Sequence, residues 1–284
     1  MDYKNFSIRL MTENDLEPIM VLKNLLGWNQ TEADWKALMN FEPKGCFVAV
    51  QKDVVIGTAT TTSYGTDLGW IGMLIVHPDK RNLGIGRELL NQCIQYLNDI
   101  HVNCIKLDAT PIGKKLYLSF GFRDEYTLKR IKGKCKQLEY NNENIIPLQL
   151  EKIKVFDKKY FIADRSKILD RLYKEFPNYC FQSIDENGNI NGYVMVREGI
   201  SSYHLGPLVS ENYDISINLF SHIFSIFQDK EIIFDIGEHH KELIDFLIHN
   251  GFVIQRELYR MYLGNNPFKI NDNFVVASSS AEKG

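Results

Sequence analysis

The chain has 284 residues, of which 44% are hydrophobic and 12% aromatic. This length predicts two domains rather than one, and this apolar content excludes global disorder. Lys and Arg number 33 against 36 Asp and Glu, a formal net charge of −3. That balance disfavours a dedicated nucleic-acid binder, because such proteins usually carry a basic excess.

Strands and helices are expected to alternate in the first half of the chain. Alternating or β-branched apolar runs predict the strands, and apolar residues at helical spacing predict the helices. The order predicts an α/β (α+β) fold with a mixed, mostly antiparallel sheet flanked by helices. In chain order we expect a strand at 6–11, helices at 16–26 and 31–39, strands at 45–50, 54–62 and 68–76, a helix at 86–98, a strand at 104–109, a short helix at 113–120 and a strand at 126–131.

A weak internal repeat links the two halves of the chain. Gly121-Phe122 is followed by Arg130, and Gly251-Phe252 is followed by Arg260 at the same spacing. Each Gly-Phe pair follows a short amphipathic stretch that itself follows a predicted strand, and the offset is about 130 residues. Two copies of one fold are the simplest explanation.

The polar stretch 133–150, with an Asn cluster and a Pro, is the best linker candidate. We therefore expect a first domain at 1–135, a linker at 136–150 and a second domain at 151–284. Within the second domain, Asp185–Asn189 lies between two apolar runs and predicts a β-hairpin.

Targeting signals and cysteine usage both favour a cytoplasmic protein. No apolar run approaches the roughly 18–20 residues that span a bilayer, and the first residues lack the apolar core of a signal peptide. The cysteines are scattered, odd in number and without a CxxC pair, which disfavours a disulfide scaffold and a zinc ribbon. We therefore expect a cytoplasmic protein with reduced thiols, no membrane partner and no metal. The cysteines are Cys46, Cys93, Cys104, Cys135 and Cys180.

The most informative stretch is 74–90, where an apolar strand leads through a glycine-containing turn into an amphipathic helix. The start of a helix presents unpaired backbone N–H groups and the positive end of the helix dipole. Gly84 and Gly86 let an anion approach the backbone closely, and Arg81 and Arg87 add positive charge. The stretch predicts a phosphate or pyrophosphate site.

Two common phosphate motifs fit this stretch poorly. A P-loop needs Gly-Lys-Ser/Thr, and the dinucleotide fingerprint needs a third glycine where Leu89 stands. Arg81–Gly86 (RNLGIG) instead matches Arg/Gln-x-x-Gly-x-Gly/Ala, and it follows a strand that ends Val76-x-Pro78. After the next strand comes Leu116–Phe122 (LYLSFGF). Together these features resemble the GNAT acyltransferases, which bind the pyrophosphate of acetyl-CoA in this turn.

The chain is similar in particular to a tandem subfamily of GNAT proteins, and the resemblance covers nearly the whole sequence. It implies an N-terminal GNAT domain and a degenerate C-terminal GNAT-like domain, each with a twisted, mostly antiparallel sheet flanked by helices. The segments that carry it are Trp70–Pro78, Leu107–Phe122, Phe161–Ser166, Leu205–Val209 and Gly251–Gly264.

The resemblance implies an N-acetyltransferase that moves the acetyl group of acetyl-CoA directly to an amine. The strand Met73–Val76 would separate from its neighbour, line the pantetheine and offer a backbone N–H to the thioester oxygen. Leu83–Arg87 would hold the pyrophosphate, and Tyr117, a phenol with a pKa near ~10, would protonate the CoA sulfur. The cofactor-binding residues so implied are Leu74, Ile75, Val76, Arg81, Asn82, Leu83, Gly84, Ile85, Gly86, Arg87, Thr110 and Gly113.

Three positions near this site carry alternatives. Many GNAT enzymes place Asn where this chain has Thr110, whose hydroxyl could still contact CoA. Asp108 could act as the general base, directly or through water, or could cap the following turn. His77, before Pro78, fits a solvated loop histidine better than a base.

The residues expected on the acceptor side also have more than one interpretation. Four aromatic residues could wall a site for a cation or an apolar amine, or could belong to the ordinary core. Glu32 and Asp34 could attract a cationic acceptor or face water. The aromatic residues are Trp28, Trp35, Tyr64 and Trp70.

The second copy lacks both features that would handle CoA. The place of its pyrophosphate turn is Val209–Ser216 (VSENYDIS), which has no glycine and carries Glu211 and Asp214. Leu247 stands at the position that Tyr117 holds in the first copy. We expect this copy to bind no CoA and to shape the acceptor cleft of the first domain.

Other functions stay open at this point. A non-catalytic acyl-CoA-binding sensor would bind the donor without turnover, and a generic phosphate-binding protein would bind ATP and CoA equally. The adjacent His239 and His240 diverge on a helix, which favours a polar helix start over a metal site. A small-molecule amine is expected over a protein as acceptor, and the protein is expected as a monomer or homodimer.

Overall fold

The computed structural model describes residues 5–140, 143–161, 163–266 and 273–284. The chain divides by contacts into two compact units that are interleaved in sequence. The first unit comprises residues 1–123, 261–266 and 283, and the second comprises 124–260, 267–282 and 284. Contacts thus assign 124–134 to the second unit and 261–266 to the first, whereas the sequence predicts contiguous domains.

The expected linker at 136–150 contains structure of its own. Its residues 145–147 form a short strand, β7, that pairs with a strand of the second unit. Residues 141–142 of the expected linker lie outside the described residues. The boundaries predicted for the two copies of the fold, 1–135 and 151–284, stay a prediction.

The first unit is a sheet flanked by helices, as expected, and the strand order is β1-β2-β3-β4-β5. Strands β1 to β4 pair antiparallel, and β5 runs parallel to β4. Its strands are β1 (Ser7–Leu10), β2 (Cys46–Gln51), β3 (Val54–Tyr64), β4 (Leu68–Val76) and β5 (Cys104–Ala109). Its helices are α1 (Leu16–Asn24), α2 (Glu32–Phe41), α3 (Ile85–Asp99) and α4 (Lys114–Leu118), with short 3-10 turns at Glu13–Asp15 and Pro78–Lys80.

Local signals explain where these elements begin and end. Lys52 and Asp53 both adopt positive φ, 49° and 64°, as a tight two-residue hairpin turn between β2 and β3 requires. Thr31 and Asp34 form a reciprocal capping box at the start of α2. Gly121, with φ 87°, lies past the end of α4, where a left-handed residue commonly stops a helix.

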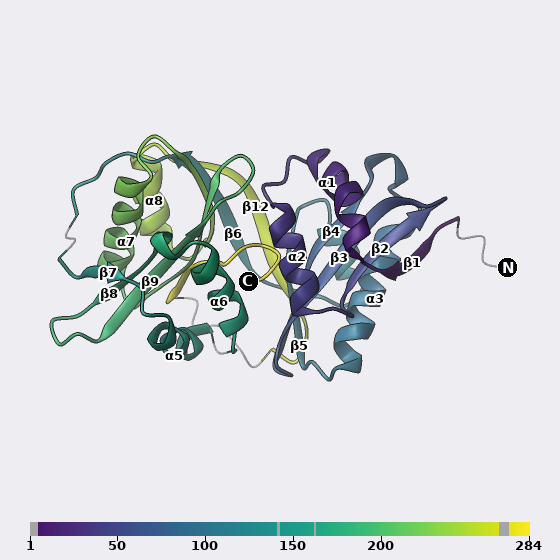
Figure 1. Ribbon diagram of the computed structural model, residues 1–284, viewed down its shortest axis with the longest axis horizontal. Helices are drawn as coiled ribbons and strands as arrows, with labels where there is room; N and C mark the ends of the chain where they lie inside the picture. Colours follow the sequence, from purple (N-terminus) through teal and green to yellow (C-terminus); the bar gives the residue numbers. More distant parts are fainter. Residues whose placement is uncertain (1–4, 141–142, 162, 267–272) are drawn as a thin grey trace. The chain divides into compact units, whose positions relative to one another are not determined.

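The two faces of this sheet carry different helices. A Cβ on Gly57 of β3 would contact Ile85 and Leu89 of α3, so α3 covers that face. On the other face Trp35 and Leu38 of α2 share an apolar cluster with Met73 and Ile75 of β4. Figure 1 shows α1 and α2 over β2–β4. Side chains of β3 and β4 therefore face either α3 or the pair α1 and α2, according to their position along the strand.

The second unit repeats the pattern, with the strand order β12-β6-β11-β13-β10-β9-β8-β7. The expected hairpin at Asp185–Asn189 joins β8 and β9. Each unit is a mixed, mostly antiparallel sheet flanked by helices, which confirms the predicted fold class. The strands with all or most of their residues in this unit are β6 (Arg123–Lys134), β7 (Ile145–Pro147), β8 (Cys180–Ile184), β9 (Ile190–Arg197), β10 (Tyr203–Ser210), β11 (Glu231–Gly237), β12 (Val253–Gly264) and β13 (Val275–Ala277). Its helices are α5 (Leu150–Phe161), α6 (Ser166–Glu175), α7 (Tyr213–Ile226) and α8 (Lys241–His249), with a 3-10 turn at Pro177–Tyr179.

The two arginines of the sequence repeat are structural residues of the second unit. Arg130 on β6 donates two hydrogen bonds of 2.7 Å to the carboxylate of Asp235 on β11, and Asp235 is fully buried. Burial alone would raise the pKa of Asp235, but the Arg130 guanidinium holds it below its ordinary value. Arg260 on β12 donates to the Tyr126 hydroxyl at 2.7 Å.

Candidate active site

The strand β4 carries a bulge in its middle. Gly72 pairs with Thr60 and Ile75 with Thr58, so two steps along β3 correspond to three along β4. Met73, inside the bulge, has a positive φ of 49°. The Thr58 hydroxyl donates to the Met73 carbonyl at 2.7 Å and satisfies this displaced group. The bulge turns the backbone of β4 away from the regular ladder.

Just before the bulge, β4 separates from its parallel neighbour β5. Their pairing runs from Leu68–Trp70 to Cys104–Lys106, and among the described residues it extends no further. The carboxyl ends of two parallel strands therefore diverge next to each other. Ligands of open α/β sheets bind outside such ends.

The glycine turn lies at the carboxyl end of β4 and opens α3. Asn82 and Gly84 adopt positive φ, 64° and 81°, and Gly84 is the N-cap of this 15-residue helix. A Cβ on Gly84 would meet no atom within 4 Å, so there is free space beside the first N–H groups of α3. The geometry suits an anion that approaches the backbone.

Gly86 connects this turn to the strand. A Cβ on Gly86 would contact Leu116, Val76 and Leu74 at 3.5–3.8 Å. Leu74 and Val76 therefore lie on the α3 face, whereas Ile75 belongs to the apolar cluster under α1 and α2. Of the three strand residues expected to line a pantetheine, Ile75 is placed to contribute its backbone rather than its side chain.

The two arginines of the turn differ in their surroundings. Arg87 donates from Nη2 to the Ser119 hydroxyl at 3.0 Å, and its guanidinium lies 5.0 Å from the centre of the Phe120 ring. These contacts fix a positive charge near the end of α4. Arg81, like Asn82 and Leu83, is exposed to solvent.

Tyr117 lies on α4 and is buried, with 8% of its surface exposed. Its ring packs edge-on against Phe122 with centroids 6.0 Å apart. Burial, and secondarily the nearby Cys93, raises the pKa of Tyr117 above its ordinary value. The phenol therefore stays protonated at neutral pH, which is the state that a proton donor needs.

The remaining residues considered for this site lie near the ends of β4 and β5. Thr110 Oγ1 accepts a hydrogen bond of 3.2 Å from the backbone N–H of Gly113, the N-cap of α4, so both residues shape that helix start. Asp108 is partly buried near the end of β5, past the paired residues. His77 accepts from the backbone N–H of Asp79 at 3.3 Å and caps the short turn after β4.

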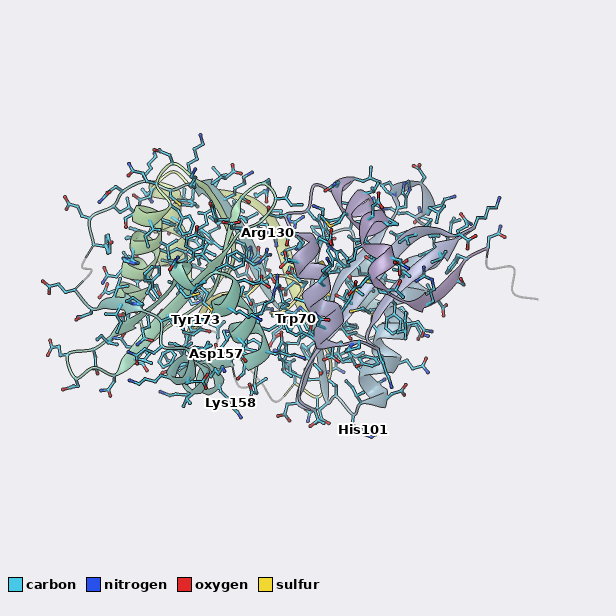
Figure 2. All side chains as sticks on the ribbon, viewed as in Figure 1. Trp70, His101, Arg130, Asp157, Lys158 and Tyr173 are labelled. Carbon is cyan, nitrogen blue, oxygen red and sulfur yellow. The ribbon has the colours of Figure 1, made fainter. Side chains whose placement is uncertain are left out.

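The aromatic residues expected on the acceptor side are mostly core residues. Trp35 and Trp70 are fully buried, Tyr64 is 2% exposed, and Trp28 is partly buried against the cluster that contains Trp35. Figure 2 labels Trp70 among the strands of the first unit. Asp34, for which contact with water was one expectation, is 1% exposed, while Glu32 is half exposed and pairs with Lys36.

Two features of this unit are not among those that the sequence predicts. One is the row of threonines on β3, Thr58, Thr60 and Thr62, which the alternating letters TATTT could have revealed. The other is Lys283, which contacts assign to the first unit and which has no local sequence signal.

The second unit has the same βαβ frame with different contents. Its parallel pair, β10 and β11, is joined only at Tyr203–His204 and Ile232–Ile233 in the described residues, and β10 carries a bulge against β9 between Leu205 and Leu208. Strand β13 then lies between them, with Ala277 opposite both Leu208 of β10 and Ile236 of β11. Among the residues that the structure describes, no strand bridges the corresponding gap between β4 and β5, whereas here β13 bridges it.

Other site types find little support. The described residues contain no group of three or more His, Cys, Asp or Glu side chains arranged to hold a metal ion. The rings of His239 and His240 lie 4.4 Å apart, and His239 packs edge-on against Tyr126. None of the helices that the structure describes is long and apolar enough to cross a membrane.

Comparisons with known proteins follow the same division of the chain. A model described as the acetyltransferase (GNAT) family matches residues 14–122, and one described as an acetyltransferase (GNAT) domain matches residues 153–276. Holothin acyltransferase of Pseudoalteromonas sp. (strain SANK 73390) is 23% identical over 244 residues, which cover 84% of this chain and 82% of the relative.

Two solved structures share the fold over most of the chain. A Pyrococcus horikoshii protein, provisionally described as an acetyltransferase, superposes with a TM-score of 0.82 at 23% identity and covers 100% of this chain and 98% of its own. A tandem GNAT protein from the clavulanic acid biosynthesis pathway gives a TM-score of 0.63 at 11% identity, over 91% of this chain and 98% of its own.

Fold and matches together define a protein of the acyltransferase class, built from two copies of one fold. The chain belongs to the GNAT family and carries two GNAT domains in tandem. Acyl transfer is the class of reaction that the family and the acyltransferase relative support.

Proposed function

We propose that the protein is a cytoplasmic N-acetyltransferase that moves the acetyl group of acetyl-CoA to an amine, with the donor bound in the first unit. The observation that carries the proposal is the combination, in one unit, of a bulged strand, its separation from β5, and an uncapped glycine turn at the start of α3. A small-molecule acceptor is part of the proposal, as expected from the sequence, and the relative described above is named holothin acyltransferase.

The residues of the first unit suit the donor. Its pyrophosphate would meet the N–H groups that follow Gly84, with Arg81 and Arg87 nearby, and the free space beside Gly84 accommodates it. Leu74 and Val76, on the α3 face, would contact the pantetheine arm, which would run between the diverging ends of β4 and β5.

Bound acetyl-CoA would supply an activated thioester carbon, and the chain's own groups would handle the charges and protons. A backbone N–H at the bulge of β4 would stabilise the oxyanion, because a fixed donor costs no reorganisation during the reaction. Tyr117, held protonated by its raised pKa, would give its proton to the departing thiolate. Asp108, at the end of β5, would take the amine proton directly or through water.

Calorimetric titration of the full-length protein with acetyl-CoA tests the donor site. We expect one site per chain with sub-millimolar affinity, followed by CoA release in an amine screen. Two sites would contradict the assignment of the second unit as closed to the donor, and absence of binding would overturn the proposal. One site without turnover of any amine would favour an acyl-CoA sensor.

A further inference from the structure

Strands β6 and β12 are neighbours in the sheet (Figure 1), and side-chain contacts within the second unit give their register. Arg260 on β12 donates to the Tyr126 hydroxyl on β6 at 2.7 Å. Lys129 on β6 forms an ion pair with Glu257 on β12. The three steps from Tyr126 to Lys129 thus correspond to three steps backwards along β12, which indicates an antiparallel register.

This register sets Arg130 of β6 directly opposite Arg256 of β12. Leu128 and Leu258, which the same register pairs one step further along this face, are both buried. Opposite side chains on one face of an antiparallel pair have Cβ atoms about 4.5–5.5 Å apart, and like charges there are destabilising. The two guanidinium groups therefore repel each other unless negative charge lies beside both.

The carboxylate nearest to this pair is already engaged by one of the two arginines. Both oxygens of Asp235 accept hydrogen bonds of 2.7 Å from Arg130. Arg256 Nε is buried and has no hydrogen-bond partner among the described residues. Burial, and next the charge of Arg130, lowers the pKa of Arg256 to about 10, against the attraction of Asp235. Arg256 is therefore still charged at neutral pH and poorly compensated.

The groups around Asp235 leave one positive charge in excess. Burial lowers the pKa of His204 to about 3, so this imidazole is neutral at pH 7. Arg197 lies 3.7 Å from the Glu282 carboxylate, and these two charges balance. Since Asp235 balances only one of the two opposed arginines, the charge of Arg256 is the one left over.

We propose that Arg256, opposite Arg130, is an anion-binding site of the second unit that takes the carboxylate group of a small organic acid. A guanidinium presents its N–H groups as a planar fork that matches a carboxylate in two parallel hydrogen bonds. A carboxylate carries one negative charge, which equals the excess, whereas a phosphate dianion would exceed it. Arg256 is partly exposed, so a solute can reach the residue.

The Nε–H signal of Arg256 reports binding at the residue itself, in full-length protein that carries 15N-labelled arginine. Arg256→Lys identifies this signal by its loss. Sodium acetate is titrated at constant ionic strength, with sodium chloride as the reference salt. We expect a shift of the signal that saturates with acetate and does not occur with chloride. A signal that acetate leaves in place, or that both salts move equally, would overturn the proposal.

Urea unfolding separates anion binding from a purely structural role. Arg256→Gln removes the charge that opposes Arg130, so in chloride this variant should be at least as stable as the wild type. Acetate should raise the unfolding midpoint of the wild type but not that of Arg256→Gln. Lys129→Gln is the matched control, because it removes a cation from the other face of the same strand pair, and its response to acetate should be retained.

The opposite pattern would contradict the site. If Arg256→Gln is less stable than the wild type in chloride and acetate stabilises neither protein, Arg256 serves Asp235 and the proposal is overturned. Sodium phosphate tests the class of anion, and a signal that shifts at lower concentrations of phosphate than of acetate would overturn the assignment to a carboxylate. None of these measurements requires acetyl transfer, so failure of the proposed function would leave them unaffected.

Discussion

Each unit contains a parallel strand pair whose carboxyl ends diverge, but the two units differ in whether another strand lies between those ends. In the first, β4 and β5 part after Trp70 and Lys106. In the second, β10 and β11 part after His204 and Ile233, and β13 bonds to both. The same strand frame therefore leaves room for a ligand in the first unit, where we propose that the donor binds, and is closed by the chain's own backbone in the second.

The helix that follows the bulged strand also differs between the two units, because its N-terminus is open in the first and capped in the second. In the first unit α3 begins after Gly84, which offers no side chain to the first N–H groups. In the second unit Asn212 caps α7 by accepting from the Ile215 N–H at 3.0 Å, and Asp214 stands in the first turn. A self-capped and negatively charged helix start does not attract phosphate.

Positions shared by both units have structural roles, whereas one position that differs holds the proton donor that we propose. Gly121 and Gly251 both adopt positive φ, 87° and 92°, after α4 and α8, and the Phe that follows each is buried. Tyr117 and Leu247 precede these glycines by the same number of residues and are both buried, but only the tyrosine can donate a proton.

The largest expected effect concerns a shared, structural position. Arg130→Met leaves the fully buried Asp235 without its bidentate partner, and breaking such a pair costs about 3–5 kcal/mol. Because the folded-state pKa of Asp235 is lowered, its contribution is present above its unfolded pKa and is lost as pH falls through the folded value. Urea unfolding at neutral and acid pH should show a loss in Arg130→Met that shrinks toward acid pH.

The double variant Arg130→Met with Asp235→Leu provides the control for that loss. Replacing both partners by apolar groups should recover much of the stability, because no uncompensated charge remains. A single variant as stable as the wild type at neutral pH would show that the pair does not hold β6 to β11.

The second prediction concerns the open helix start. Gly86→Glu places a carboxylate at the first turn of α3, where we propose that pyrophosphate binds. Acetyl-CoA affinity should fall about a hundredfold, because like charges repel and the N–H groups are blocked. The matched change in the other unit, Asp214→Asn, should leave affinity and stoichiometry unchanged by calorimetry. Residual binding of one equivalent in Gly86→Glu would place the donor elsewhere.

The third prediction separates catalysis from binding. Tyr117→Phe keeps the ring against Phe122 and removes the proton donor, so kcat should fall by roughly ten- to hundredfold while acetyl-CoA affinity is kept. Since burial raises the pKa of Tyr117, the wild-type rate should show no loss from this group until pH exceeds the ordinary phenol value of about 10. Equal turnover of both proteins across this range would exclude Tyr117 as the acid.

Much of the fold and part of the site followed from sequence because their signals are local. The expected strand 68–76 agrees with β4, and the start of α3 was visible in the glycines of Arg81–Gly86. The assignment of 124–134 and 261–266 to opposite units was not visible, because strand pairing between distant segments leaves no spacing pattern. Strand β13 escaped notice for the same reason.

Buried charge was the other feature that local patterns could not supply. Asp34 is a helix-capping carboxylate by its sequence position, and only the fold shows that its second oxygen faces Lys283. The unpartnered hydroxyls of Thr60 and Thr62 likewise depend on what α1 and α2 place over them. Composition predicts that a core exists, but not which polar atoms it encloses.

The smallest expected effect tests whether self-capping alone closes the second unit. Asn212→Ala removes the cap of α7 and should cost about 1 kcal/mol of stability, measured by urea unfolding. Asn212→Asp, which can still accept from Ile215, is the matched variant. Because β13 still fills the gap between β10 and β11, uncapping α7 should not create a donor site, and calorimetry should still find one acetyl-CoA per chain. A second equivalent in Asn212→Ala would mean that the cap, and not the inserted strand, separates the two units in function.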